Sequence, residues 1–80
     1  MSRLPRDLSG ADLIKALRKR GYEVERQVGS HIRIKTEQKG VHLVTVPNHS
    51  PLKLGTLSGI LADVAAHFKI SKEVLISELF

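Results

Sequence analysis

The chain has 80 residues, of which 41% are hydrophobic, and carries a formal net charge of +5 at pH 7. This length predicts a single domain over residues 1–80, because one domain usually takes ~100–200 residues. The absence of cysteine excludes a disulfide scaffold, a cysteine-based zinc site and a thiol nucleophile. No apolar run approaches the ~18 residues of a membrane span and no signal peptide opens the chain, so we expect a cytoplasmic protein.

The positive charge is concentrated in the first half of the sequence. Residues 1–40 contain ten basic and five acidic side chains, whereas residues 41–80 contain three of each. A one-sided basic surface favours a polyanion such as nucleic acid, or an acidic protein, as the partner. The alternative is a basic protein that its charge keeps soluble.

The first predicted element is a helix over residues 10–20. Ser9 and Asp12 are spaced as in a capping box at its start, and Gly21 can adopt the left-handed conformation that ends a helix. Three basic residues recur at helical spacing on one face: Lys15, Arg18 and Lys19. This face is a candidate RNA-binding surface, and a solvated helix surface is an equally good interpretation.

Three short strands are predicted next, over residues 22–27, 31–36 and 41–46. Apolar and polar residues alternate in the first two, which is typical of strands with one face on the core and one in water. Short loops that contain Gly29 and Gly40 make neighbouring strands antiparallel.

A register for the first two strands follows from placing Val24 and Ile32 on the same buried face. A three-residue loop, with Gly29 in the left-handed conformation, pairs these two residues. The same register places Glu25 opposite His31, where the carboxylate could orient the imidazole. The other predicted pairs are Tyr22 with Ile34 and Glu23 with Arg33.

Two helices complete the chain. Apolar residues at positions i, i+3, i+4, i+7 and i+11 predict a helix over residues 56–68. These residues are Leu57, Ile60, Leu61, Val64 and Phe68. Ser71 can cap a last helix over residues 72–79. The predicted fold is therefore α+β with the order α-β-β-β-α-α, in which helices cover one face of a three-stranded antiparallel sheet and leave the other face open.

His31 is the candidate catalytic residue on that open sheet face. Strand alternation directs its side chain to the same side as Arg33 and Lys35. A histidine titrates near neutral pH and can take the proton of a ribose 2′-hydroxyl, whose oxygen then attacks the adjacent phosphorus. The flanking cations can stabilise the charge that builds on the phosphate. The alternative is an RNA-binding or acidic-partner-binding module that does not cleave.

No metal site is predicted. A zinc ion needs three or four converging ligands. The four histidines are 7 to 18 residues apart and have neither cysteine nor a pattern of acidic residues beside them: His31, His42, His49 and His67. No cofactor is expected either.

The three aromatic residues fit core positions. They are Tyr22, Phe68 and Phe80. A platform that stacks the bases of single-stranded nucleic acid needs exposed aromatic rings, so contact with phosphate and sugar is expected instead.

Three motifs resemble the HicA-type toxin family in their order and spacing, over nearly the whole chain. They are Gly29-Ser30-His31, Val46-Pro47-Asn48-His49, and Gly55-Thr56-Leu57 leading into Ile60-Leu61. The resemblance implies a fold similar to the double-stranded-RNA-binding domain and a toxin that cleaves mRNA without a metal ion. It also implies a HicB-type antitoxin as the partner, which binds the toxin and blocks its site.

The resemblance also implies roles for individual residues. The catalytic histidine of the family matches His31, and Gly29 and Ser30 match the turn that positions this histidine. His49 matches a further motif position. Together with the basic strand residues, the expected RNA contacts are Ser30, Arg33, Lys35, Lys15, Arg18 and Lys19.

Overall fold

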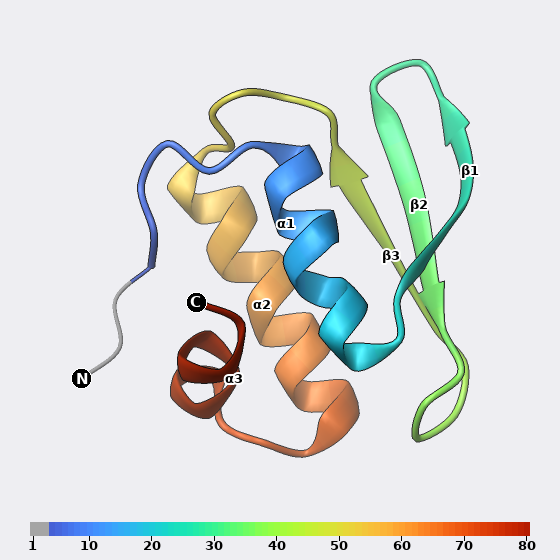
Figure 1. The fold of residues 1–80 in the computed structure, drawn as a ribbon, viewed down its shortest axis with the longest axis vertical. Helices are drawn as coiled ribbons and strands as arrows, with labels where there is room; N and C mark the ends of the chain where they lie inside the picture. Colours follow the sequence, from blue (N-terminus) through green and yellow to red (C-terminus); the bar gives the residue numbers. More distant parts are fainter. Residues whose placement is uncertain (1–3) are drawn as a thin grey trace.

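A computed structural model describes residues 4–80, and in it three helices lie on one side of a three-stranded sheet (Figure 1). In chain order the elements are α1 (Gly10–Leu17), a 3₁₀ turn (Arg18–Arg20), β1 (Glu23–Val28), β2 (His31–Thr36), β3 (His42–Pro47), α2 (Leu54–Phe68) and α3 (Lys72–Leu79). The strands are antiparallel in the order β1-β2-β3. The predicted α+β class and element order are confirmed. Within residues 4–80, no helix has the length and apolar character needed to cross a membrane.

Local signals determine where α1 begins and ends. The Ser9 hydroxyl accepts a hydrogen bond from the Asp12 amide at 3.0 Å, and the Asp12 carboxylate accepts one from the Ser9 amide at 3.3 Å. This capping box satisfies two amides that have no partner within the helix. After the 3₁₀ turn, Gly21 adopts φ 80°, a left-handed conformation that suits glycine. The chain can then reverse into β1.

The core lies between the helices and one face of β2 and β3. Its completely buried members come from every layer: Leu13, Leu17, Tyr22, Ile34, Val46, Leu61, Val64 and Leu75. The apolar stripe of α2 and the alternation of β2 and β3 are therefore directed at each other, as predicted. Phe80, in contrast, is 46% exposed, so the expectation that it belongs to the core is wrong. It follows the last turn of α3, beyond the helix face that packs on the core.

β1 contributes no side chain to the core, although it belongs to the sheet. All six of its residues are exposed, whereas Tyr22 immediately before it is fully buried. In Figure 1, β1 is the strand farthest from α2, so the β1–β2 hairpin extends past the helical layer. Burial therefore places no constraint on which β1 residues face the helices.

The predicted register of β1 and β2 is wrong. Val24 pairs with Ile34, and Val28 pairs with His31, across a two-residue turn formed by Gly29 and Ser30. Gly29 has φ 59°, so its predicted left-handed conformation is correct although the loop is one residue shorter. The prediction assumed that Val24 must be buried, but Val24 is 48% exposed.

The same change of register moves Glu25 away from His31. The pairing is irregular between Val24 and Arg26, which places Glu25 in a bulge. The Cα partner of His31 on β1 is Val28. The expectation that Glu25 orients His31 from the opposite strand is therefore wrong.

A polar network joins the start of β1 to β3 and α2. Nε2 of His42 lies 3.3 Å from the Asp63 carboxylate. Nδ1 of the same ring and the Tyr22 hydroxyl form a hydrogen bond of 2.6 Å. The His67 ring stacks on His42 with centroids 4.5 Å apart and donates through Nε2 to the Gln38 carbonyl at 2.9 Å. Burial raises the pKa of the Tyr22 hydroxyl well above its ordinary value, and the Asp63 carboxylate adds to this effect.

Ultraviolet titration of Tyr22 tests this environment, because the chain has one tyrosine and no tryptophan. We expect no phenolate absorbance in the native protein near pH 10, where an exposed tyrosine ionises. The folded pKa is raised, so this group's contribution to stability is complete below about pH 10 and is lost as the pH rises above it. Phenolate should therefore appear together with alkaline unfolding. Native-state ionisation near pH 10 would contradict the buried network.

Gly10 allows α1 to approach the end of β3. Its amide donates to the His49 carbonyl at 2.9 Å, and an added Cβ would lie well inside the contact distance of the Pro47 carbonyl oxygen. We expect Gly10→Ala to lower the free energy of unfolding by about 1–3 kcal/mol, since backbone must move to admit the methyl group. Urea denaturation measures this.

Gly59 is the matched control, since it also lies in a helix but has no atom within 4 Å of a built Cβ. Gly59→Ala should be stabilising by up to about 1 kcal/mol. Equal effects of the two substitutions would show that the close approach at Gly10 has no energetic importance.

Candidate active site

The open face of the sheet is the surface opposite the helices, and β2 runs through its centre. Ile32, Ile34 and Thr36 of β2 are buried against the helical side. The alternate residues of the strand therefore project from the open face, because successive side chains point to opposite sides. These residues are His31, Arg33 and Lys35, with the first two exposed and the third half-buried. The structure thus brings the three predicted residues together on one surface.

The neighbouring strands supply further side chains around His31 and Arg33. On β3, Pro47 lies opposite His31 and Thr45 lies opposite Arg33. On β1, the residue opposite Arg33 is Arg26. A pocket of about 470 Å³ is lined by Arg26, Val28, His31, Arg33 and Thr45. This open-face pocket combines an imidazole, two guanidinium groups and a hydroxyl in one shallow depression.

Arg26, Val28 and Thr45 line this pocket but were not among the predicted site residues, and Arg26 is the charged one of the three. The predicted three-residue loop would have placed Arg26 beside the turn rather than opposite Arg33. The dipeptide Gly29-Ser30 is the signal that could have identified it, since a glycine followed by one polar residue is a common two-residue hairpin loop. With that loop length, Arg26 and Arg33 fall on neighbouring strands of one face.

The two arginines of the pocket are electrostatically unsatisfied. Like charges directly opposite each other on neighbouring strands destabilise a sheet. Within residues 4–80, neither guanidinium lies within 4.0 Å of a carboxylate oxygen. A guanidinium matches the geometry of phosphate or carboxylate oxygens, so the pair is suited to an anion that bridges it.

Backbone hydrogen bonds hold the turn before His31. The Ser30 carbonyl accepts from the Asn48 amide at 2.6 Å, which joins the β1–β2 turn to the segment after β3. The Gln27 side chain donates to the Gly29 carbonyl at 3.0 Å. The predicted turn residues therefore position His31 through main-chain contacts. His49 lies in the segment next to this turn, and its side chain is exposed.

The predicted basic residues of α1 are not part of this pocket. Lys15 and Arg18 are exposed on the helical side of the sheet, whereas His31 is on the open face. Lys19 donates to the carbonyls of Glu78 and Leu79 at 3.4 and 3.3 Å, at the end of α3. The predicted RNA contacts therefore lie on two separate surfaces of the described residues. A role of the α1 residues in RNA binding stays a prediction.

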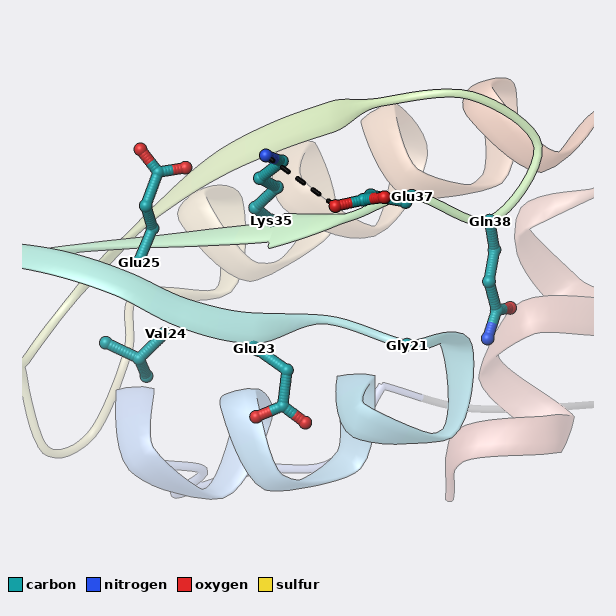
Figure 2. Close-up of a pocket in the computed structure, with 7 residues that line it drawn as sticks. All are labelled: Gly21, Glu23, Val24, Glu25, Lys35, Glu37 and Gln38. Carbon is teal, nitrogen blue, oxygen red and sulfur yellow. Dashed lines mark ion pairs between the residues drawn. The ribbon is translucent and has the colours of Figure 1, made fainter.

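A second pocket, of about 570 Å³, lies beside β1 at the other end of β2 (Figure 2). Its charged lining consists of three carboxylates and one ammonium group: Glu23, Glu25, Glu37 and Lys35. The Lys35 ammonium lies 3.8 Å from the Glu37 carboxylate, and Figure 2 shows it directed towards that residue. Carboxylates outnumber the ammonium group in this pocket, whereas the open-face pocket holds two guanidinium groups and no carboxylate among its described residues, so the pocket at His31 is the better anion site.

The remaining titratable side chains do not converge on a metal. Among residues 4–80, no group of three or more histidine, cysteine or acidic residues is arranged to hold a metal ion. His42 and His67 have their ring contacts in the Tyr22 network instead. His31 is thus the histidine that faces a cationic pocket.

A family model described as the HicA toxin of bacterial toxin-antitoxin systems matches residues 10–65. The chain belongs to the HicA toxin family. The matched region contains α1, the whole sheet and most of α2, and it includes every residue that lines the open-face pocket. α3 follows the matched region of this HicA-family chain. No curated protein and no solved structure matches the chain.

The charge conflict in the open-face pocket predicts a gain in stability when one arginine is neutralised. We expect Arg26→Gln to raise the urea midpoint at low ionic strength, because it removes the repulsion from Arg33. The gain should disappear at about 1 M salt, where exposed charges are screened over ~3 Å. Lys69→Asn, which removes an exposed charge from the left-handed residue after α2, is the control and should show no such salt dependence. A midpoint for Arg26→Gln below wild type at low salt would show that the guanidiniums do not repel each other.

Proposed function

We propose that this toxin is an endoribonuclease that cleaves mRNA with His31 and without a metal ion. The proposal is supported chiefly by the open-face pocket, in which His31 lies beside Arg26 and Arg33. Membership of a toxin family in toxin-antitoxin systems agrees with an activity that harms the cell that makes it. Because mRNA is the substrate, the toxin acts in the cytoplasm.

The chemistry needs one base and a clamp for the phosphate. Neutral His31 takes the proton of the ribose 2′-hydroxyl, and the 2′-oxygen bonds to the adjacent phosphorus. The bond from phosphorus to the 5′-oxygen breaks, and that oxygen takes a proton from the imidazolium or from water. The products are a 2′,3′-cyclic phosphate and a 5′-hydroxyl end. Arg26 and Arg33 donate to the non-bridging oxygens and stabilise their growing charge.

The partner that controls this activity is an antitoxin of the HicB type. No described segment of the chain covers the open-face pocket, and its charged lining consists of the guanidinium groups of Arg26 and Arg33. An acidic surface of the antitoxin would complement this charge and increase the rate of association. Bound there, it would exclude RNA from His31.

Substitution of His31 tests the enzymatic role. Expression of the wild type in bacteria should arrest growth and degrade mRNA, and His31→Ala should abolish both, because loss of a general base costs about 10²–10⁴-fold in rate. Purified wild type should cleave RNA in the presence of EDTA and leave cyclic phosphate ends. His49→Ala, at the other exposed histidine near the turn, distinguishes loss of a base at His31 from a general effect at this end of the molecule. RNA that is bound but intact would identify a binding module instead, and full toxicity of His31→Ala would refute the assignment.

Arg26 gives an independent test of the phosphate clamp. We expect Arg26→Ala to lower kcat by about 10²-fold, as does loss of one donor to a developing negative charge. Lys69→Asn serves as the control, because it also removes one positive charge but lies at the end of α2. Single-turnover cleavage of a short RNA measures the effect. If the two variants cleaved equally fast, long-range charge rather than contact with the phosphate would explain any loss.

A further inference from the structure

The cationic residues of the open face form a row along β2. Arg33 follows His31 by two residues and Lys35 follows Arg33 by two, all on one side of the strand. We propose that this row binds RNA as an extended, unpaired strand, with the scissile phosphate at His31, Arg33 and Arg26 and the next phosphate at Lys35. This inference rests on the proposed ribonuclease function and defines its substrate as single-stranded RNA.

The spacing of the row supports this placement. A β-strand rises ~3.3 Å per residue, so side chains two residues apart on one face are about 6.6 Å from each other. Consecutive phosphates of an extended nucleotide chain have a similar separation. One nucleotide placed in the open-face pocket would therefore bring its neighbour's phosphate to Lys35.

The position of His31 disfavours a duplex as the substrate. In-line attack requires the 2′-oxygen, the phosphorus and the 5′-oxygen to align, and the backbone of an A-form helix holds them far from that alignment. A rigid duplex bound to the open face would also make no contact with the basic residues Lys15 and Arg18, because these lie on the helical side of the sheet. An unpaired strand can adopt the in-line geometry and follow β2 at the same time.

The open face contacts the backbone of the RNA rather than stacking its bases. Tyr22 and Phe68 are buried in the core, and Phe80 ends the chain after α3 on the helical side (Figure 1). The apolar contacts next to the cations come from Val28 and Leu43, which are 60% and 42% exposed. Every nucleotide presents the same phosphate and ribose, so binding along this row depends little on the identity of the base.

Three carboxylates limit the contribution of Lys35: Glu23 is its Cα partner on β1, and Glu25 and Glu37 line the same pocket. Glu37 is the one that forms an ion pair with the ammonium group. Its carboxylate pairs with the Lys35 ammonium at 3.8 Å, and the Glu37 side chain is 79% exposed. An exposed pair of this kind contributes little to stability, so a phosphate can displace the carboxylate. Glu37 nevertheless competes with the phosphate for the ammonium group. Its removal should therefore strengthen RNA binding, which is the opposite of the effect of neutralising Lys35.

The experiment uses a fluorescent 12-nucleotide 2′-O-methyl RNA, which cannot be cleaved by 2′-attack, alone or annealed to its complement. Anisotropy at several salt concentrations should show that wild type binds the single strand about tenfold or more tightly than the duplex. Lys35→Gln and Arg33→Gln should each weaken binding and reduce the salt slope by about 1, as expected for loss of one phosphate contact. Glu37→Gln should strengthen binding.

Lys15→Gln combined with Arg18→Gln tests the alternative surface on α1, and Lys69→Asn corrects for net charge. Equal or tighter binding of the duplex, or a larger loss from the α1 variant than from Lys35→Gln, would overturn the single-strand row. These measurements are independent of cleavage because the probe is not cut. If His31→Ala still cleaves RNA while the single strand binds as described, the proposed catalytic role of His31 is wrong. The proposal that the β2 row binds single-stranded RNA is then retained. If cleavage depends on His31 but the duplex binds more tightly than the single strand, only the proposed single-strand binding row is refuted.

Discussion

One-sided burial of the sheet is the constraint on which the rest of the structure depends. Ile34 and Val46 are completely buried against the helices, as are Leu13 and Leu61 on the helical side of this contact. Full burial of such a side chain stabilises the fold by about 1.5–3 kcal/mol. A shift of β2 by one residue would bury Arg33 and expose Ile34, so the core strongly disfavours it. The alignment of the cations on the open face is thus a consequence of the packing behind them.

β1 follows a different rule because no helix covers it. Its side chains are exposed on both faces, so core packing leaves the choice of residues on this strand free. Arg26 therefore lies opposite Arg33 without any cost in core packing. This arrangement is unfavourable in the protein alone and favourable when an anion binds between the two guanidinium groups. The bulge at Glu25 also interrupts the regular edge of the sheet, which discourages pairing with another chain.

The histidines show how tertiary contacts separate residues of one type into different roles. Both ring nitrogens of His42 are engaged, one with the Tyr22 hydroxyl and one with the Asp63 carboxylate. Such a ring orients its neighbours and has no free nitrogen to accept a substrate proton. His31, at the start of β2, faces the solvent and two guanidiniums instead. The family identifies the chain as a toxin, and this difference in surroundings is what points to one histidine.

The sequence by itself determined the features that depend on neighbouring residues. The capping box of Ser9 and Asp12 and the helical stripe of α2 are local patterns, and strand alternation alone directs His31 and Arg33 to one face. Only the tertiary structure decided the register of β1. Gly29 is compatible with a loop of two or three residues, and the choice depends on whether the helices reach over the hairpin. They do not, so Val24 is exposed and Arg26, rather than Glu25, joins the pocket.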